Sequence, residues 1–264
     1  MSTEAERAMS LRWLASRGRP VAAPTPFLDA LLATRNVAIG RVLPWLLLFG
    51  ALATAGSIGY HELFGPGATV GTPAYFACFA IQLAIWLSAR SRQRALAKQT
   101  RRWPGATHER PGGWFVASAA LAYGGGAALA LVLFFATPAR TYAASWLGLL
   151  LLSALCSGCV LAGFLRAPVL AVDEPSLAVY RALLAENVHA AAPALAAVPP
   201  ILDVALGNRL PAGYGGWLVA YAALVVATEL VAYVRSRRPL PPGHYGDPLP
   251  VQTDVDWSPR SFGA

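Results

Sequence analysis

Charged residues and cysteine are both scarce in this chain of 264 residues. Only 13% of the residues are charged, against about 25% in a typical soluble domain, whereas 56% are hydrophobic and the mean hydropathy is +0.49. This balance excludes an ordinary soluble domain and indicates lipid as the solvent. The three cysteines, Cys78, Cys156 and Cys159, all fall inside apolar runs, so no extracellular disulfide framework is implied.

The signals of several functional classes are also missing. No GxxxxGK[ST] loop is present to bind ATP phosphates. No metal-ligand spacing and no recognisable set of catalytic groups occurs, so we expect no metal, no cofactor and no catalytic activity of the chain itself. The first 35 residues have neither an uninterrupted apolar core nor a small-residue cleavage site, which predicts no cleaved signal peptide.

Six apolar runs reach or approach the length of about 20 residues that crosses the hydrocarbon core of a bilayer. Trp and Tyr stand near many of their ends, as in interfacial aromatic belts. The sequence therefore predicts an all-α integral membrane protein with six transmembrane helices and short amphipathic surface helices. The predicted spans are 42–60, 72–89, 114–136, 145–165, 188–206 and 216–234.

Positive charge alternates between the connections. A net charge of +8 can indicate nucleic-acid binding, but here the cations lie in short segments beside apolar runs, as topology signals do. Lys and Arg number six before the first span, seven and two in the second and fourth connections and four in the tail, against none, one and one in the other connections. With 19 of the 21 cations on one side, we predict cytoplasmic termini and no nucleic-acid partner. The Ala-rich composition with Arg in place of Lys favours a bacterial plasma membrane.

The densest basic segment, 90–110, follows the second span. If the helix of that span continues, its cations share one face and lie at the lipid head groups, each contributing about 1 kcal/mol. The competing interpretation is a docking surface for a protein partner on the cytoplasmic side. The residues expected to make either contact are Arg90, Arg94, Lys98, Arg101 and Arg102.

Two amphipathic helices are predicted outside the spans. Residues 1–36 form a basic cytoplasmic arm that ends in a helix capped by Thr25, whose apolar stripe we expect in the membrane surface. A second helix begins at Asp173-Glu174-Pro175, and its apolar face predicts contact with the membrane or a partner. The Pro-rich residues 239–264 are predicted to be a disordered tail, which leaves 37–238 as the membrane domain.

The fifth span is the least regular. Pro193 and the pair Pro199-Pro200 remove backbone donors, so the helix should be kinked or broken where protein or a water cavity covers the freed carbonyls. One interpretation is a discontinuous helix beside a substrate path, with Asp203 near its outer end. The other is a structural kink with Asp203 already at the interface.

Glu229 lies six residues before Arg235, about 9 Å deep at 1.5 Å per residue. An acid at that depth should face the bundle interior and have a partner, for which Arg41 is a candidate. Glu229 has two interpretations. One is a role in coupling protons or cations to transport, and the other is a structural ion pair. His61 and Glu62, at the outer end of the first span, form with Asp203 either a small polar cluster or separate solvated groups.

A surface helix before the first span, six spans with both ends inside, and cytoplasmic helices after spans two and four resemble the membrane subunit of an ABC-type exporter. The resemblance covers architecture and no residue motif. It implies a permease working with a separate ATPase that docks on residues 177–187 and the basic loop. The competing function is a non-transporting accessory, assembly or regulatory subunit, and self-association into a homo-oligomer stays open.

Overall fold

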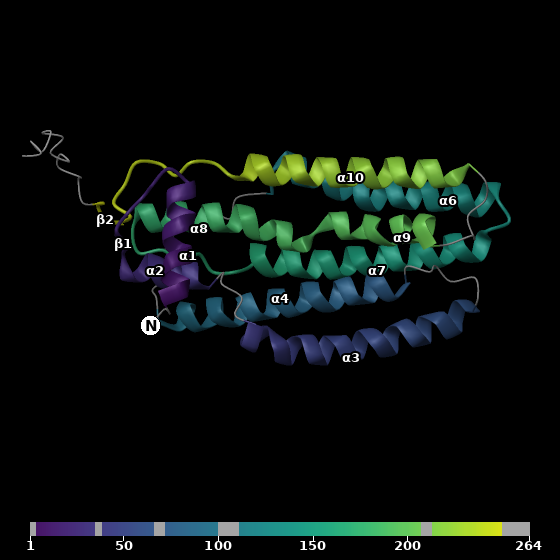
Figure 1. Ribbon diagram of the computed structural model, residues 1–264, viewed down its shortest axis with the longest axis horizontal. Helices are drawn as coiled ribbons and strands as arrows, with labels where there is room; N and C mark the ends of the chain where they lie inside the picture. The colour runs from purple at the N-terminus through teal and green to yellow at the C-terminus, as the bar shows by residue number, and fades with distance from the viewer. Residues whose placement is uncertain (1–3, 35–38, 66–71, 100–110, 207–212, 250–264) are drawn as a thin grey trace, which may run out of the picture.

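The computed structural model describes residues 4–34, 39–65, 72–99, 111–206 and 213–249. Among these residues, six helical segments are long and apolar enough to cross a membrane. They lie lengthwise beside one another as an elongated bundle (Figure 1). The prediction of six apolar spanning helices is therefore confirmed.

Each predicted span lies within an observed helix or a run of consecutive helices. Helix α4 continues ten residues beyond the predicted end of its span, so the helix does extend into the basic segment. The spans are α3 (Ile39–Phe64), α4 (Thr72–Gln99), α5 (Gly113–Ala119) with η2 (Ala120–Gly125) and α6 (Gly126–Ala136), α7 (Arg140–Leu165), α8 (Glu174–Asn187) through α9 (Val198–Leu206), and α10 (Tyr214–Ser236).

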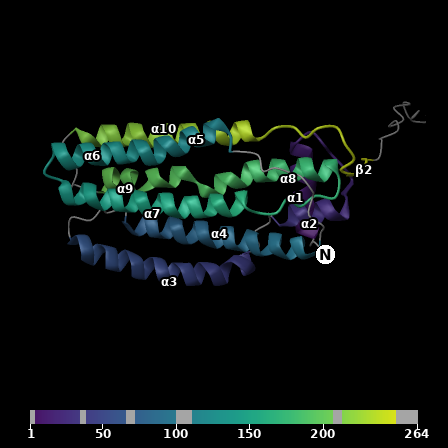
Figure 2. The same cartoon turned by 180° about the vertical axis from the view of Figure 1, so that it is seen from behind.

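Helix α3 lies at the edge of the bundle, where it packs mainly against α4 (Figures 1 and 2). Only 6% of its most apolar stretch is buried, against 22–41% in the other spans. Leu47, Leu52 and Leu63 are exposed along it, as suits a helix whose surroundings are lipid. The remaining five spans form the interior of the bundle.

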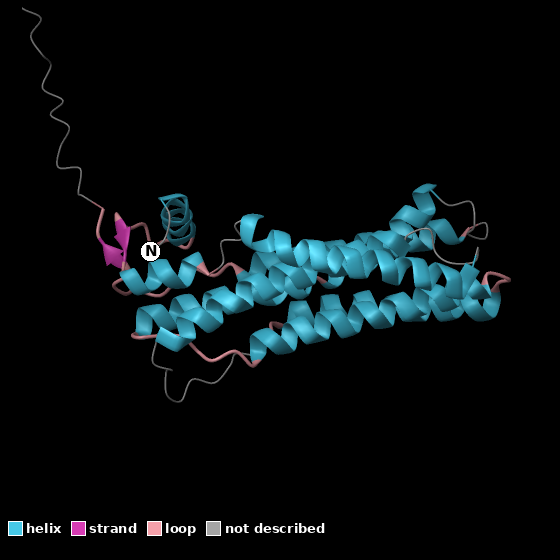
Figure 3. Cartoon of the chain, turned by 90° about the horizontal axis from the view of Figure 1, so that it is seen from below, coloured by secondary structure: helices cyan, strands magenta, loops and turns pink. Residues whose placement is uncertain are grey.

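A small layer of structure covers one end of the bundle (Figure 3). It contains α1 (Glu4–Ser16), α2 (Pro26–Ala33) and a two-residue antiparallel ladder in which β1 (Ala23–Pro24) pairs with β2 (Gly246–Asp247). Because β1 belongs to the first part of the chain and β2 to the last described part, this ladder brings the two ends of the chain together.

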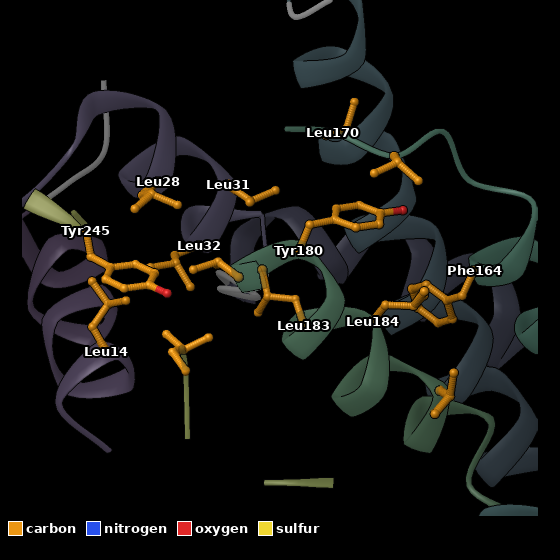
Figure 4. Close-up of a cluster of buried hydrophobic side chains, with 14 of the residues drawn as sticks. Leu14, Leu28, Leu31, Leu32, Phe164, Leu170, Tyr180, Leu183, Leu184 and Tyr245 are labelled. Carbon is orange, nitrogen blue, oxygen red and sulfur yellow. The ribbon is translucent and has the colours of Figure 1, made fainter. Parts of the chain in front are cut away.

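The helix predicted after Thr25 is present, but its surroundings differ from the prediction. The Thr25 hydroxyl accepts a hydrogen bond from the Leu28 amide at 3.4 Å, and Pro26 is the first helical residue. The apolar stripe, including Leu31 and Leu32, is buried in a core shared with α8 and the C-terminal segment (Figure 4). The expectation that this stripe lies in the membrane surface is wrong, because protein covers it.

Helix α8 begins where predicted, with a capping box. Asp173 accepts from the Ser176 amide at 2.8 Å, and the Ser176 hydroxyl accepts from the Asp173 amide at 3.0 Å. Its apolar face, including Tyr180 and Leu184, packs in the same core as α2 (Figure 4). The contact predicted with membrane or partner is thus made within the chain, and α8 forms the first part of the fifth span.

The described part of the predicted disordered tail, residues 239–249, packs against the N-terminal segment. Leu240 and Tyr245 are buried, and the Leu240 amide donates to the Arg17 carbonyl at 3.1 Å. The Tyr245 hydroxyl donates to the Pro241 carbonyl at 2.9 Å, and burial raises the pKa of this tyrosine. Two apolar anchors therefore hold a Pro-rich segment in place. Residues 250–264 lie outside the described residues.

Candidate functional site

The fifth span is broken near its middle. Helix α8 passes into the 3₁₀ segment η3 (Val188–Ala191), and after Ala192 a second 3₁₀ segment, η4 (Pro193–Ala197), leads to α9. Ala192 has a left-handed backbone with φ of 41°, which costs an alanine free energy and ends the helical ladder. The break predicted for this span is present, but it lies at Ala192-Pro193. Pro199 and Pro200 fall in the first turn of α9, where a missing amide hydrogen is tolerated.

Side chains from two other spans donate to the carbonyls that the break releases, and a tyrosine from a third span donates to one of these side chains. The Gln82 amide nitrogen on α4 donates to the carbonyls of Ala190 at 3.1 Å and Ala191 at 2.6 Å. Ser157 on α7 also donates to Ala191, at 2.6 Å, and accepts from Tyr123 of η2 at 2.7 Å. Protein therefore covers the irregular backbone, as a low-dielectric setting requires.

The third span is irregular at the same level. Its segment η2 is π-helical and contains Tyr123, which reaches Ser157 beside the break. The Tyr221 hydroxyl of α10 donates to the Ala122 carbonyl of η2 at 2.5 Å. Single π-helical turns inside α-helices occur frequently at functional sites. Two of the six spans thus depart from α-helical geometry side by side.

Glu229 faces the bundle next to the break. One of its carboxylate oxygens, Oε1, lies 2.7 Å from Nδ1 of His189 in η3, and the other accepts from the Ser118 hydroxyl of α5 at 2.7 Å. The side chains of His189 and Glu229 are 10% and 15% exposed. Sequence reasoning missed His189, although a histidine within an apolar span was the available signal. The side chain of Arg41, the suggested partner, lies outside the described residues.

Aromatic rings orient the imidazole of His189. Phe115 and Tyr233 both meet it edge to face, with ring centroids at 5.4 and 5.6 Å. Imidazole and carboxylate groups in contact can share, accept and release a proton. The arrangement is therefore an imidazole–carboxylate pair held between α5, η3 and α10.

A cleft of about 300 Å³ opens beside this pair, at the end of the bundle that is covered by the end layer of α1, α2 and the β1–β2 ladder. The start of α5, the last turns of α8 and the end of α10 bound it. His189 lines the cleft, with Glu229 behind it. The cleft is also lined by Trp114, Arg181, Arg235 and Arg238.

Asp203 is buried inside the bundle. It is 2% exposed, and its Oδ2 accepts from the Tyr142 hydroxyl at 2.9 Å. His61 and Glu62 are instead exposed at the end of α3, so the structure does not gather these three residues. Among the described residues, no group of three or more His, Cys, Asp or Glu is placed to hold a metal ion.

The basic face of α4 lies beside the loop that precedes α8. Arg90 and Arg94 line a small crevice with Tyr180, whereas Lys98 is exposed. Arg101 and Arg102 lie outside the described residues. The cation that joins α4 to the end layer is Arg92, which sequence reasoning did not single out: it donates to the Ala33 carbonyl and lies 3.5 Å from Glu6.

No protein-family model, no curated protein and no solved structure matches this chain.

Proposed function

We propose that this chain is a multi-pass membrane transport protein in which the His189–Glu229 pair binds and releases a proton that the chain carries across the membrane. One observation carries the proposal. The pair lies between the break in the fifth span and a cleft at the end of the bundle, and His189 belongs to all three features: the pair, the η3 segment and the cleft wall.

The geometry suggests how a proton would act on the backbone. A proton that arrives through the cleft converts the imidazole to imidazolium, which strengthens its attraction to the Glu229 carboxylate. Loss of that proton weakens the contact between η3 and α10. Because η3 adjoins Ala192, the strength of this contact biases the position of the broken segment, which also accepts hydrogen bonds from Gln82 and Ser157.

We further infer that the end carrying α1, α2 and the β1–β2 ladder is cytoplasmic and that the membrane is a bacterial plasma membrane. In support, six spans return the chain to the side where it started, and the ladder joins its two ends. The segments assigned to this side hold 19 of the 21 Lys and Arg residues, as the positive-inside rule requires.

An ABC-type permease and an accessory subunit are alternatives that stay predictions. The apolar face of residues 177–187, expected to dock an ATPase, packs against the chain's own α2 and C-terminal segment. An ATPase would therefore have to bind the polar outside of the end layer. An accessory subunit, unlike a proton-linked transporter, needs no proton movement at Glu229.

Proton flux into proteoliposomes tests the proposal. The full chain is reconstituted with a pH-sensitive dye inside, a pH gradient is imposed, and valinomycin with K⁺ clamps the membrane potential. We expect wild-type protein to acidify the lumen faster than protein-free vesicles, and Glu229→Gln to lower the rate to that background. Glu174→Gln, the same change at an exposed glutamate, should keep the wild-type rate.

Two results would contradict proton transport through the His189–Glu229 pair. One is a wild-type rate equal to that of protein-free vesicles. The other is an unchanged rate in Glu229→Gln protein whose insertion and elution profile match the wild type.

A further inference from the structure

The cleft beside His189 is strongly basic at its rim. Arg181, Arg235 and Arg238 line it, and none of the described residues that line it is acidic. Arginine presents a planar fork of donors that matches the oxygens of phosphate. An excess of such groups around one hollow indicates an anionic ligand.

The position of the cleft suggests where that ligand comes from. Helix α5 begins at Gly113 and α10 ends at Ser236, and both residues line the cleft. The cleft therefore lies where two spans leave the apolar layer, at the depth of lipid head groups. Trp114, 42% exposed at its edge, is the residue type enriched at that depth.

Arg235 is held in place for binding. Its guanidinium carbon lies 4.8 Å from the ring centroid of Trp114, so the indole supports one face of the guanidinium while its N–H edge stays available. The backbone of Arg238 is fixed as well, because its carbonyl accepts from Nη1 of Arg17 at 2.7 Å. The two cations thus stand on ordered backbone at the cleft rim.

An apolar surface continues from the cleft toward the middle of the bundle. Val231 lies one turn before Arg235 on the same face of α10 and is 37% exposed. A ligand with a phosphate at Arg235 and a hydrocarbon chain along α10 satisfies both surfaces. A volume of about 300 Å³ is at the small end for ligand pockets and suits a head group.

We propose that this cleft binds the phosphate group of an anionic membrane lipid, with Arg235 and Arg238 as its ligands. Basic pockets between spanning helices on the cytoplasmic side bind such head groups. A soluble phosphate compound offers the same chemistry without the chain. The site does not depend on proton movement by His189 and Glu229, and its test measures binding alone.

Binding to the purified full chain in detergent distinguishes these sources. Native mass spectrometry counts bound phosphatidylglycerol, with phosphatidylcholine as the reference lipid, and inorganic phosphate is titrated as a competitor. We expect Arg235→Gln and Arg238→Gln each to weaken phosphatidylglycerol binding about tenfold, the loss of one charge-assisted contact. Arg237→Gln is the matched control, because Arg237 lies on Tyr233 outside the cleft, and should change binding less than about twofold.

Each outcome decides the question. Phosphatidylglycerol binding that depends on Arg235 and Arg238 supports the site and a lipid source. Binding of inorganic phosphate alone, with the same dependence, supports the site and a soluble source. Equal losses in all three variants would show general surface charge, and no loss in any variant would show that nothing binds here; either result overturns the proposal.

Discussion

Two partly or fully buried glutamates at one end of the bundle have opposite kinds of partner. Glu186, in the last turn of α8, pairs with Arg17 of the N-terminal segment, and both side chains are 3% exposed. Arg17 also donates to the carbonyls of Ser236 and Arg238, and Trp13 donates to Glu186 at 3.3 Å. The Glu186 carboxylate is therefore held by a guanidinium and an indole N–H.

Glu229 has a partner that can change its charge. It contacts His189 and Ser118 and is more exposed than Glu186. The histidine also lines the cleft. Glu186 and His189 are only three residues apart, so the Arg17–Glu186 pair and the His189–Glu229 pair hold adjacent turns of the same segment. The Arg17–Glu186 pair therefore anchors the end layer, whereas the His189–Glu229 pair borders the cleft.

The largest expected effect on stability comes from breaking the Arg17–Glu186 pair. Arg17→Met leaves the carboxylate of Glu186 buried without its counter-ion, which should lower the free energy of unfolding by about 3–5 kcal/mol. Arg12→Met, at an exposed position of α1, should change it by less than about 0.5 kcal/mol. Thermal unfolding in detergent measures both.

A double variant sharpens this prediction. Arg17→Met with Glu186→Met removes both charges and should recover most of the lost stability, because an apolar pair of similar volume can replace a buried ion pair. If Arg17→Met cost no more than Arg12→Met, Glu186 would not depend on its counter-ion and the contrast with Glu229 would be lost.

A smaller effect is expected at the break itself. Gln82→Leu removes the donor to the carbonyls of Ala190 and Ala191, which should lower stability by about 1–3 kcal/mol. Gln93→Leu on the same helix is the matched control, because Gln93 Oε1 is buried without a hydrogen-bond partner in the described chain. It should be neutral or stabilising. Equal losses in the two variants would mean that Gln82 only fills space.

Local signals made the spans and helix starts predictable. Apolar length fixes the six spans, and the caps at Thr25 and Asp173 depend on residues three positions apart. The position of the break was not predictable in this way. Three prolines indicated a kink or break without saying which of them would mark it, and the carbonyl next to the left-handed Ala192 is held by Gln82, which is more than 100 residues earlier in the chain.

The candidate site shows the same limit. The depth of Glu229 indicated a buried acid with a partner, but that His189 is the partner depends on how η3 packs against α10. The C-terminal segment is a further case, since its order comes from Leu240 and Tyr245 reaching the N-terminal helices. Composition describes neither contact, because both join segments that are distant in sequence.

The smallest expected effect tests whether Ser118 stabilises the His189–Glu229 pair. Ser118→Ala removes the hydroxyl that donates to Glu229 at 2.7 Å, so stability should fall by about 0.5–1.5 kcal/mol. Ser91→Ala, whose hydroxyl bonds only to its own helix among the described residues, should leave it within about 0.5 kcal/mol. If Glu229 carries the proton, Ser118→Ala should also slow proton flux by about two- to tenfold, the same free energy expressed as a rate. If stability fell while the rate of proton flux stayed the same, Ser118 would be a structural residue only. The proton flux attributed to Glu229 would then depend on His189 and not on Ser118.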